Sequence, residues 1–187
     1  MNMTKGVCYT LPFYDENTDT HYHYLYDFID EVSKKIPIFL IIEKKKGQIS
    51  HFQDVEKIYV QKFSWFPIRF VEYKLALFRA RVSGFSDFYT HYSFVGGFMT
   101  AITAKLLGGR ALYWNCGMPW LYRTNIFREW IFLFILKNLT LVTGTERMKE
   151  FYKEKYGLKD DAIKVFSNWI DISTFRGSLP DKEESRE

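Results

Sequence analysis

Short apolar runs recur along the chain and predict a series of buried strands. The clearest is PIFLIIE, residues 37–43, which has no polar alternation and is therefore expected to be covered on both faces, as strands of a parallel sheet are. The other segments with strand-like composition cover residues 5–12, 55–63, 85–93, 110–117, 139–145 and 162–168.

Helix-like segments lie between these runs. Pro67 suits the first turn of a helix and Gly157 suits a helix end. The predicted helices cover residues 20–35, 67–82, 94–109, 125–138 and 146–158. This alternation predicts an α/β fold, a Rossmann-like doubly wound parallel sheet with helices on both faces. Segments 37–43 and 139–144 are expected to be inner strands.

The carboxyl ends of the strands are where ligands bind in such a sheet. His91 ends one predicted strand and Asn115 follows the next, so we expect both to flank one cleft. The alternative for His91 is a structural histidine that is bonded inside the core. We expect this edge to expose several rings and polar groups, from Tyr14, His91, Tyr92, Trp114, Asn115, Trp120 and Tyr122.

Composition narrows the class of protein. The 187 residues suit one domain, and 47% apolar residues exclude a disordered chain. A net charge of +4 is too small to indicate nucleic-acid binding. Cys8 and Cys116 lie too far apart for a disulfide framework, and the first residues lack a signal-peptide pattern, so we expect a cytoplasmic protein.

Two segments, residues 63–85 and 118–132, mix aromatic rings with Lys and Arg. On the predicted helix 67–82 one stripe of large apolar residues consists of Val71, Leu75, Phe78 and Val82. Two interpretations stay open for this helix. Its stripe either packs on the sheet, or lies against a lipid surface, which would make the protein peripheral at the inner membrane face.

The last third of the chain resembles the end of the N-terminal domain in retaining GT-B glycosyltransferases of family 4. The matching residues are Thr145, Glu146, Tyr156, Gly157, Leu158, Val165, Asn168, Asp171 and Phe175. Residues 84–117 also resemble the central strand, His-bearing loop, helix and next strand of that domain. The likeness in layout covers roughly residues 5–187, and it is specific over 84–117 and 139–175.

This resemblance implies a domain organisation and a function. Residues 1–175 would be the acceptor-side Rossmann-like domain, and residues 176–187 the start of a linker to a C-terminal donor domain. The chain would be the acceptor-binding half of a glycosyltransferase, moving a sugar from a nucleotide-sugar to a glycan or lipid-linked acceptor, and inactive without a donor-binding domain or subunit. The alternative is a non-catalytic binding or membrane-recruiting subunit of a split glycosyltransferase, or a decayed remnant.

The resemblance also implies site residues. The acceptor side would use His91, Tyr92, Asn115, Cys116 and Gly117. The loop near the donor would contain Thr18, Asp19 and Thr20, but it lacks the family's glycine pair. The cleft between domains would be lined by Thr145, Glu146, Asn168 and Asp171, which from the residues alone could equally be helix caps and turns.

Three further expectations concern catalytic residues, metals and cofactors. No catalytic residue is assigned within it. Its histidines do not form a ligand set, because His21 and His23 would leave a helix in different directions, so no metal is expected. A P-loop and the GxGxxG pattern are both absent from the sequence, so no cofactor is expected either.

Overall fold

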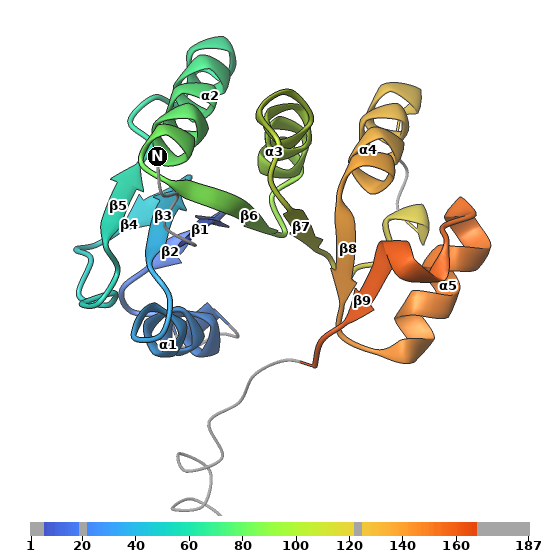
Figure 1. Ribbon diagram of the computed structural model, residues 1–187, viewed down its shortest axis with the longest axis horizontal. Coiled ribbons are helices and arrows are strands. Elements are labelled where there is room, and N and C mark those ends of the chain that lie inside the picture. The colour runs from blue at the N-terminus through green and yellow to red at the C-terminus, as the bar shows by residue number, and fades with distance from the viewer. Residues whose placement is uncertain (1–5, 19–21, 122–124, 168–187) are drawn as a thin grey trace, which may run out of the picture.

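The main element of the fold is a seven-stranded parallel sheet with helices on both faces, seen in a computed structural model that describes residues 6–18, 22–121 and 125–167 (Figure 1). The strand order is β5-β3-β1-β6-β7-β8-β9. The bounds are β1 Gly6–Leu11, β3 Ile38–Ile42, β5 Lys57–Val60, β6 Phe85–His91, β7 Ala111–Trp114, β8 Thr140–Thr143 and β9 Ile163–Val165. The doubly wound parallel sheet is confirmed, and β3 and β8 are inner strands as predicted.

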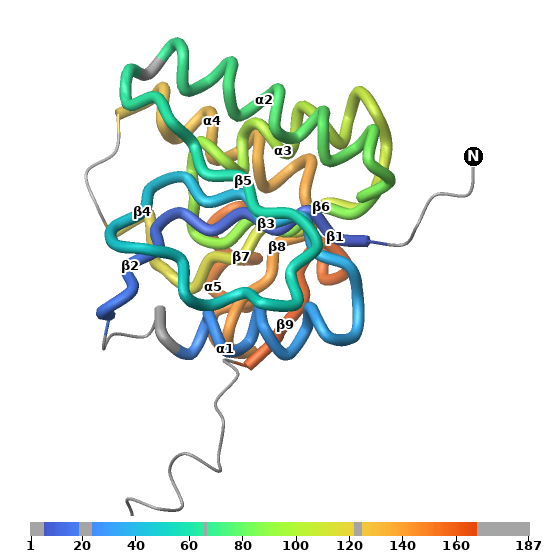
Figure 2. The backbone as a smooth tube through the Cα atoms, turned by 90° about the vertical axis from the view of Figure 1, so that its left-hand side faces the viewer, coloured from blue at the N-terminus to red at the C-terminus, as the bar shows by residue number. Residues whose placement is uncertain are grey.

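The helices form layers of unequal size. Figure 1 shows α2, α3 and α4 side by side on one face, while Figure 2 shows the sheet between α2 and α1. The bounds are α1 Tyr22–Ser33, α2 Phe66–Val82, α3 Phe94–Leu107, α4 Ile126–Asn138 and α5 Glu146–Tyr156, with short 3-10 turns at Pro119–Leu121 and Asp160–Ala162. Right-handed crossovers explain the layers, because the chain steps one way from β1 to β5 and the other way from β6 to β9.

Two apolar cores follow from this arrangement. The larger core joins the sheet to α2, α3, α4 and α5, and contains Cys8, Phe88 and Tyr113. The smaller core lies under α1 and includes Tyr9 and Leu40. Cys8 is thus a small buried core residue.

Helix α2 does not pack on the sheet through the predicted apolar stripe. Its buried apolar residues are Tyr73, Ala76, Leu77 and Ala80. The residues of the predicted stripe are exposed, with Val71 at 57% and Phe78 at 51%. Of the two interpretations left open for this stripe, packing on the sheet is therefore wrong.

A second, two-stranded parallel sheet was not predicted. It pairs β2, Tyr14–Asp15, with β4, Lys45–Lys46, in segments outside the predicted strands and helices. The Tyr14 ring anchors it, because this ring is fully buried and its hydroxyl lies 2.8 Å from His51 Nδ1. The expectation that Tyr14 would be exposed is therefore wrong.

Candidate functional site

The candidate site lies where the strand order reverses, between β1 and β6. The loops that follow these two strands run in opposite directions, and ligands bind at such points in doubly wound sheets. Three features meet at this edge: the residue after β3, the start of α3 after β6, and the first turn of α2.

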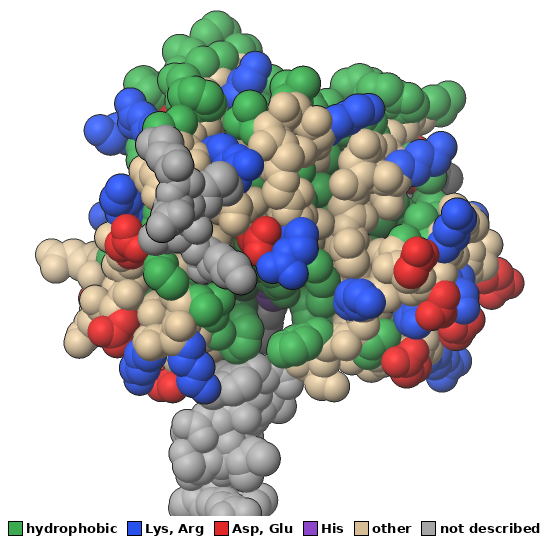
Figure 3. Space-filling model, viewed as in Figure 1, with side chains coloured by type: hydrophobic (Ala, Val, Ile, Leu, Met, Phe, Trp, Pro, Cys, Tyr) green, Lys and Arg blue, Asp and Glu red, His purple; other side chains and the backbone are tan. Residues whose placement is uncertain are grey.

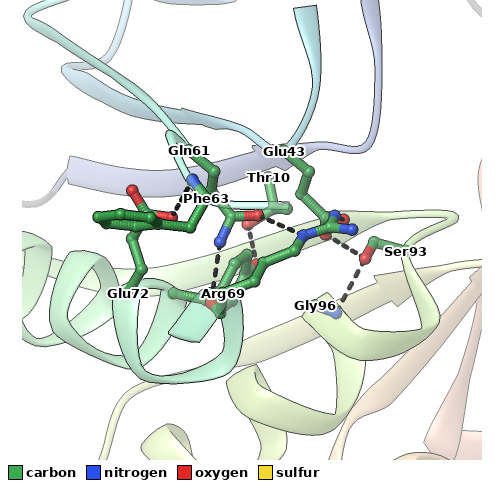
Figure 4. Close-up of polar contacts among 9 residues, drawn as sticks. Thr10, Glu43, Gln61, Phe63, Arg69, Glu72, Ser93 and Gly96 are labelled. Atoms are coloured by element: carbon green, nitrogen blue, oxygen red, sulfur yellow. Dashed lines mark hydrogen bonds and ion pairs between the residues drawn. The ribbon is translucent and has the colours of Figure 1, made fainter. Parts of the chain in front are cut away.

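Glu43 links these three elements (Figure 4). It directly follows β3 and is only 8% exposed. Arg69 of α2 donates from Nη2 to its Oε2 at 2.5 Å, and the Ser93 hydroxyl donates to its Oε1. Ser93 is also the N-cap of α3, where its Oγ accepts from the amide of Gly96 at 2.8 Å. One carboxylate thus fixes the start of α3 relative to β3 and α2.

Arg69 is held by a second set of bonds. Its Nε donates to Gln61 Oε1, and Gln61 Nε2 donates to the Arg69 carbonyl, both at 3.1 Å. Glu72, one turn further along α2, accepts from the amides of Lys62 and Phe63 at 2.8 and 3.2 Å. The guanidinium therefore lies in a fixed position at the edge, with its charge opposed by Glu43.

Gly96 is required by this network. A Cβ atom at this position would lie 2.7 Å from Ser93 Oγ and 2.9 Å from Glu43 Oε1, closer than real Cβ contacts. The Gly96–Gly97 pair lies inside α3, as predicted, and not in a phosphate-binding loop. Its first glycine makes room for the buried carboxylate.

The electrostatics of Glu43 follow from its burial. Desolvation raises the pKa of this carboxyl above its ordinary value, and the bonds from Ser93 and Arg69 offset only part of that rise. Carboxyls with raised pKa values at strand ends are candidates for proton transfer. Both oxygens of Glu43 already accept from protein donors, however, so the geometry supports a positioning role.

His91 lies in a stack of rings on the α1 side of the sheet. It is 7% exposed, its ring is parallel to Trp114 at 5.4 Å between centroids, and its Nδ1 lies 3.3 Å from the Tyr9 hydroxyl. The next residue, Tyr92, has a left-handed backbone with φ of 53° and is 37% exposed. A bulky residue in this conformation is strained, and such strain is concentrated at functional sites.

The segment Asn115–Gly117 forms a bonded turn after β7. Asn115 Oδ1 accepts from the Gly117 amide at 2.8 Å, and the Gly117 carbonyl accepts from the Tyr152 hydroxyl at 2.8 Å. Burial raises the pKa of the Cys116 thiol, with bonds from Thr143, the Gly144 amide and Tyr92 opposing the rise. A raised pKa disfavours the thiolate, which is the nucleophilic form.

His91 and Asn115 follow neighbouring strands, as predicted, but their side chains do not meet. His91 is opposite Trp114 in the β6–β7 register, so Asn115, one residue later, points to the other face of the sheet. Asn115 Nδ2 donates to Tyr113 of the larger core at 3.4 Å, whereas His91 contacts Tyr9 of the smaller core.

Two other predicted site residues lie at the start of a helix. Thr145 is the N-cap of α5, accepting from the Met148 amide at 3.2 Å, and Glu146 is exposed in the first turn. The Thr18 amide donates to the Asp15 carbonyl at 3.2 Å in the loop after β2. The predicted residues that lie outside the described ranges are Asp19, Thr20, Asn168 and Asp171.

The rings at this edge are less exposed than expected. Trp114 is 3% exposed, and it is buried like His91, while Asn115 and Trp120 are partly covered. Tyr122 lies outside the described residues. Of the residues that the sequence interpretation named, Tyr92 thus offers the most accessible ring here.

Three site residues were missed from the sequence: Glu43, Arg69 and Ser93. A signal existed for Glu43, because it is the first charged residue after an uninterrupted apolar strand. No signal existed for Arg69, whose role depends on how α2 is rotated. Within the described residues no three His, Cys, Asp or Glu side chains gather as metal ligands.

A groove of about 740 Å³ lies elsewhere, beside α1. It is lined by residues at the amino ends of strands, including Val7, Ala111 and Thr140. Because ligands of doubly wound sheets bind at the opposite ends of the strands, we do not assign the site to this groove.

The fold is similar to that of several solved proteins. UDP-GlcNAc 2-epimerase from Methanocaldococcus jannaschii matches with a TM-score of 0.60 and 12% identity, over 87% of this chain and 45% of that one. HepE from Anabaena, in complex with UDP and glucose, matches with a TM-score of 0.58 and 9% identity, over 90% of this chain and 46% of that one. No protein-family model matches the chain, and no curated protein matches it by sequence.

The chain therefore spans about half the length of the solved proteins that it resembles. At such low identity this similarity shows the fold alone. The chain forms a Rossmann-like α/β domain that corresponds to about half of each of these longer proteins.

Proposed function

We propose that this chain is the acceptor-binding half of a retaining, family 4 type GT-B glycosyltransferase, working with a donor-binding domain that is fused to it or is a separate subunit. The observation that carries the proposal is a strained, accessible Tyr92 at the reversal point of the sheet. The relatives in fold support it, since they include a UDP-GlcNAc 2-epimerase and HepE, which was solved with UDP and glucose.

The chemistry of sugar transfer gives the two domains different roles. The departing nucleoside diphosphate needs positive groups and amide donors, which the donor domain would supply. This chain would hold the acceptor on the facing wall of the cleft. Tyr92 gives a ring face for a sugar, while Glu43, Arg69 and Ser93 keep the start of α3 in place beneath it.

The experiment compares the chain alone with the chain plus its donor domain. Transfer from radiolabelled UDP-glucose and UDP-GlcNAc into glycan and lipid fractions is measured for residues 1–187, for the full gene product, and for mixtures with a separately encoded donor domain. We expect no turnover by residues 1–187 and transfer only when both halves are present. Robust turnover by this chain alone would overturn the two-domain interpretation.

A matched pair of variants tests the site. Tyr92→Asn removes the ring, yet asparagine tolerates the left-handed backbone, so the fold should be kept. We expect the KM for the acceptor to rise about tenfold or more, which corresponds to about 1.4 kcal/mol, with the KM for the donor unchanged. Thr145→Ser keeps the cap of α5 and should leave both constants unchanged.

The alternative is a non-catalytic subunit that recruits a donor-binding chain to a membrane. It is favoured by one observation, the outward apolar stripe of α2. Under this alternative Tyr92→Asn leaves transfer unchanged, while substitutions in the stripe abolish transfer in membranes. The two functions therefore give opposite patterns in the same assay.

A further inference from the structure

Helix α2 carries an apolar stripe that faces away from the sheet. The stripe residues recur three and four positions apart, and Trp65 precedes them at the N-cap with 66% of its surface exposed. Their exposed fractions are 41% for Ile68, 57% for Val71, 51% for Leu75, 51% for Phe78 and 60% for Val82. Lone exposed apolar residues are ordinary, but a continuous stripe of this length indicates a contact surface.

Helix α4 carries a second apolar stripe. Ile126 is 90% exposed, Phe127 67% and Trp130 56%. The ring of Trp130 lies between those of Phe127 and Phe134, with centroid distances of 6.4 and 6.1 Å. Phe134 in turn contacts Phe98 of α3 at 5.4 Å. Rings therefore extend from α4 onto α3.

Both stripes lie on the same side of the molecule. Figure 1 shows α2 and α4 flanking α3 on one face of the sheet, and Figure 3 shows apolar side chains along the top of the same view, over α2 and α4. We call this surface, formed by the two stripes, the outer helix surface.

The charges around the outer helix surface have one sign. Lys74 lies one turn from both Val71 and Phe78, and Arg79 lies one turn from both Leu75 and Val82. Among the described residues of α2, α3 and α4, the charged side chains classed as exposed are all cationic: Lys74, Arg79, Lys105, Arg128 and Lys137.

Acidic groups near this surface are withdrawn from solvent. Glu72 is 6% exposed and accepts from Tyr59 and two backbone amides, and Glu129 is half-buried. By contrast, α5 exposes Glu146, Glu150 and Glu154. Figure 3 shows this separation, with Asp and Glu gathered at the lower right over α5.

We propose that the outer helix surface binds an anionic lipid bilayer, with both stripes at the boundary of headgroups and acyl chains. Cations beside an apolar stripe can extend to lipid phosphates while their stems cover apolar surface. Trp65 and Trp130 suit that boundary because an indole is apolar apart from one donor. Within the described residues no helix is long and apolar enough to cross a membrane, so the contact is one of lying on the surface.

The test is flotation of the purified chain with vesicles of phosphatidylcholine alone, or of phosphatidylcholine mixed with phosphatidylglycerol. We expect binding to the mixed, anionic vesicles, weakened at high ionic strength because the attraction is partly electrostatic. Leu75→Ser/Phe78→Ser and, separately, Lys74→Glu/Arg79→Glu should each weaken binding about tenfold or more. The matched control is Phe166→Ser, since Phe166 is 53% exposed and contacts α1 on the opposite face.

The outcomes distinguish a lipid bilayer from a second copy of the chain as the partner of the outer helix surface. If circular dichroism shows that the first pair of substitutions disrupts the fold, a second pair, Val71→Ser/Val82→Ser, repeats the test. Absence of vesicle binding, or equal losses in the stripe variants and the Phe166 control, would overturn the proposal. So would self-association in sedimentation that the stripe variants abolish, because the occupant would then be a second copy. Glycosyl transfer enters none of these measurements, so the two proposals fail independently.

Discussion

Replacing Ser93 by alanine is the most direct test of the network at the start of α3. The substitution removes two bonds at once. The Gly96 amide loses its cap, and Glu43 Oε1 loses its side-chain donor inside a site that is 8% exposed. Neither loss is easily replaced by water, because Ser93 itself is 6% exposed.

The magnitude can be estimated from these two losses. Loss of an N-cap costs about 1 kcal/mol, and a buried acceptor left without its donor costs about 1–3 kcal/mol. The free energy of unfolding should therefore fall by about 2–4 kcal/mol at pH 7. For a domain of this size that corresponds to a Tm lower by about 4–16 °C.

The assay is urea denaturation, with Thr145→Ala as the matched control. Thr145 caps α5 in the same way but is exposed and contacts no buried carboxylate, so its loss should cost about 1 kcal/mol. The excess cost of Ser93→Ala should shrink in acid, since protonated Glu43 needs the donor less. If the two variants lose the same free energy of unfolding at pH 7, the buried bond to Glu43 contributes no stability and the reasoning is refuted.

Three more outcomes are expected from chemical denaturation. Because the folded-state pKa of Glu43 is raised, wild type should lose stability as pH rises above about 4.3, the ordinary Glu pKa. Glu43→Gln should remove this loss. Equal slopes of unfolding free energy against pH in the two proteins would contradict this. The Arg110 hydrogen bond lowers the pKa of Asp87, so wild type should lose this stabilisation as pH falls. Asp87→Asn should remove the same stabilisation, which is about 1 kcal/mol or less because Arg110 is 86% exposed. Leu77→Ala, at a fully buried site against the sheet, should cost about 2–5 kcal/mol, and a cost below about 1 kcal/mol would show that α2 is loosely packed.

The sheet could be predicted because its strands are apolar runs bounded by strong local signals. Segment 37–43 has no polar residue until Glu43, and Gly157 ends α5 in the left-handed conformation that favours glycine. A strand ends earlier than predicted where a side chain bonds to the backbone and so starts a turn. The strand predicted over 110–117 stops at Trp114, since Asn115 bonds the amide of Gly117.

The rotation of α2 could not be predicted from its pattern. The helix has two apolar sides, one with Val71, Leu75, Phe78 and Val82 and one with Tyr73, Ala76, Leu77 and Ala80. Both sets recur at helical spacing, so periodicity alone does not say which side is buried. The sheet contacts the second side. Because the rotation of α2 could not be predicted, the position of Arg69 and its bond to Glu43 could not be predicted either.

The order of strands has a consequence during synthesis of the chain. Strand β1 leaves the ribosome before the other strands of its sheet, and one of its edges pairs with β3, which follows soon after. Its other edge waits for β6, which is complete only at His91, well after β5 has ended at Val60. At translation rates of about 5–20 residues per second, that edge stays unpaired for roughly 2–6 s after β5 is made. During this interval an apolar strand with open backbone donors and acceptors is a template for wrong pairing between nascent chains, so the yield of folded protein should depend on a chaperone that covers the segment from β1 to β5.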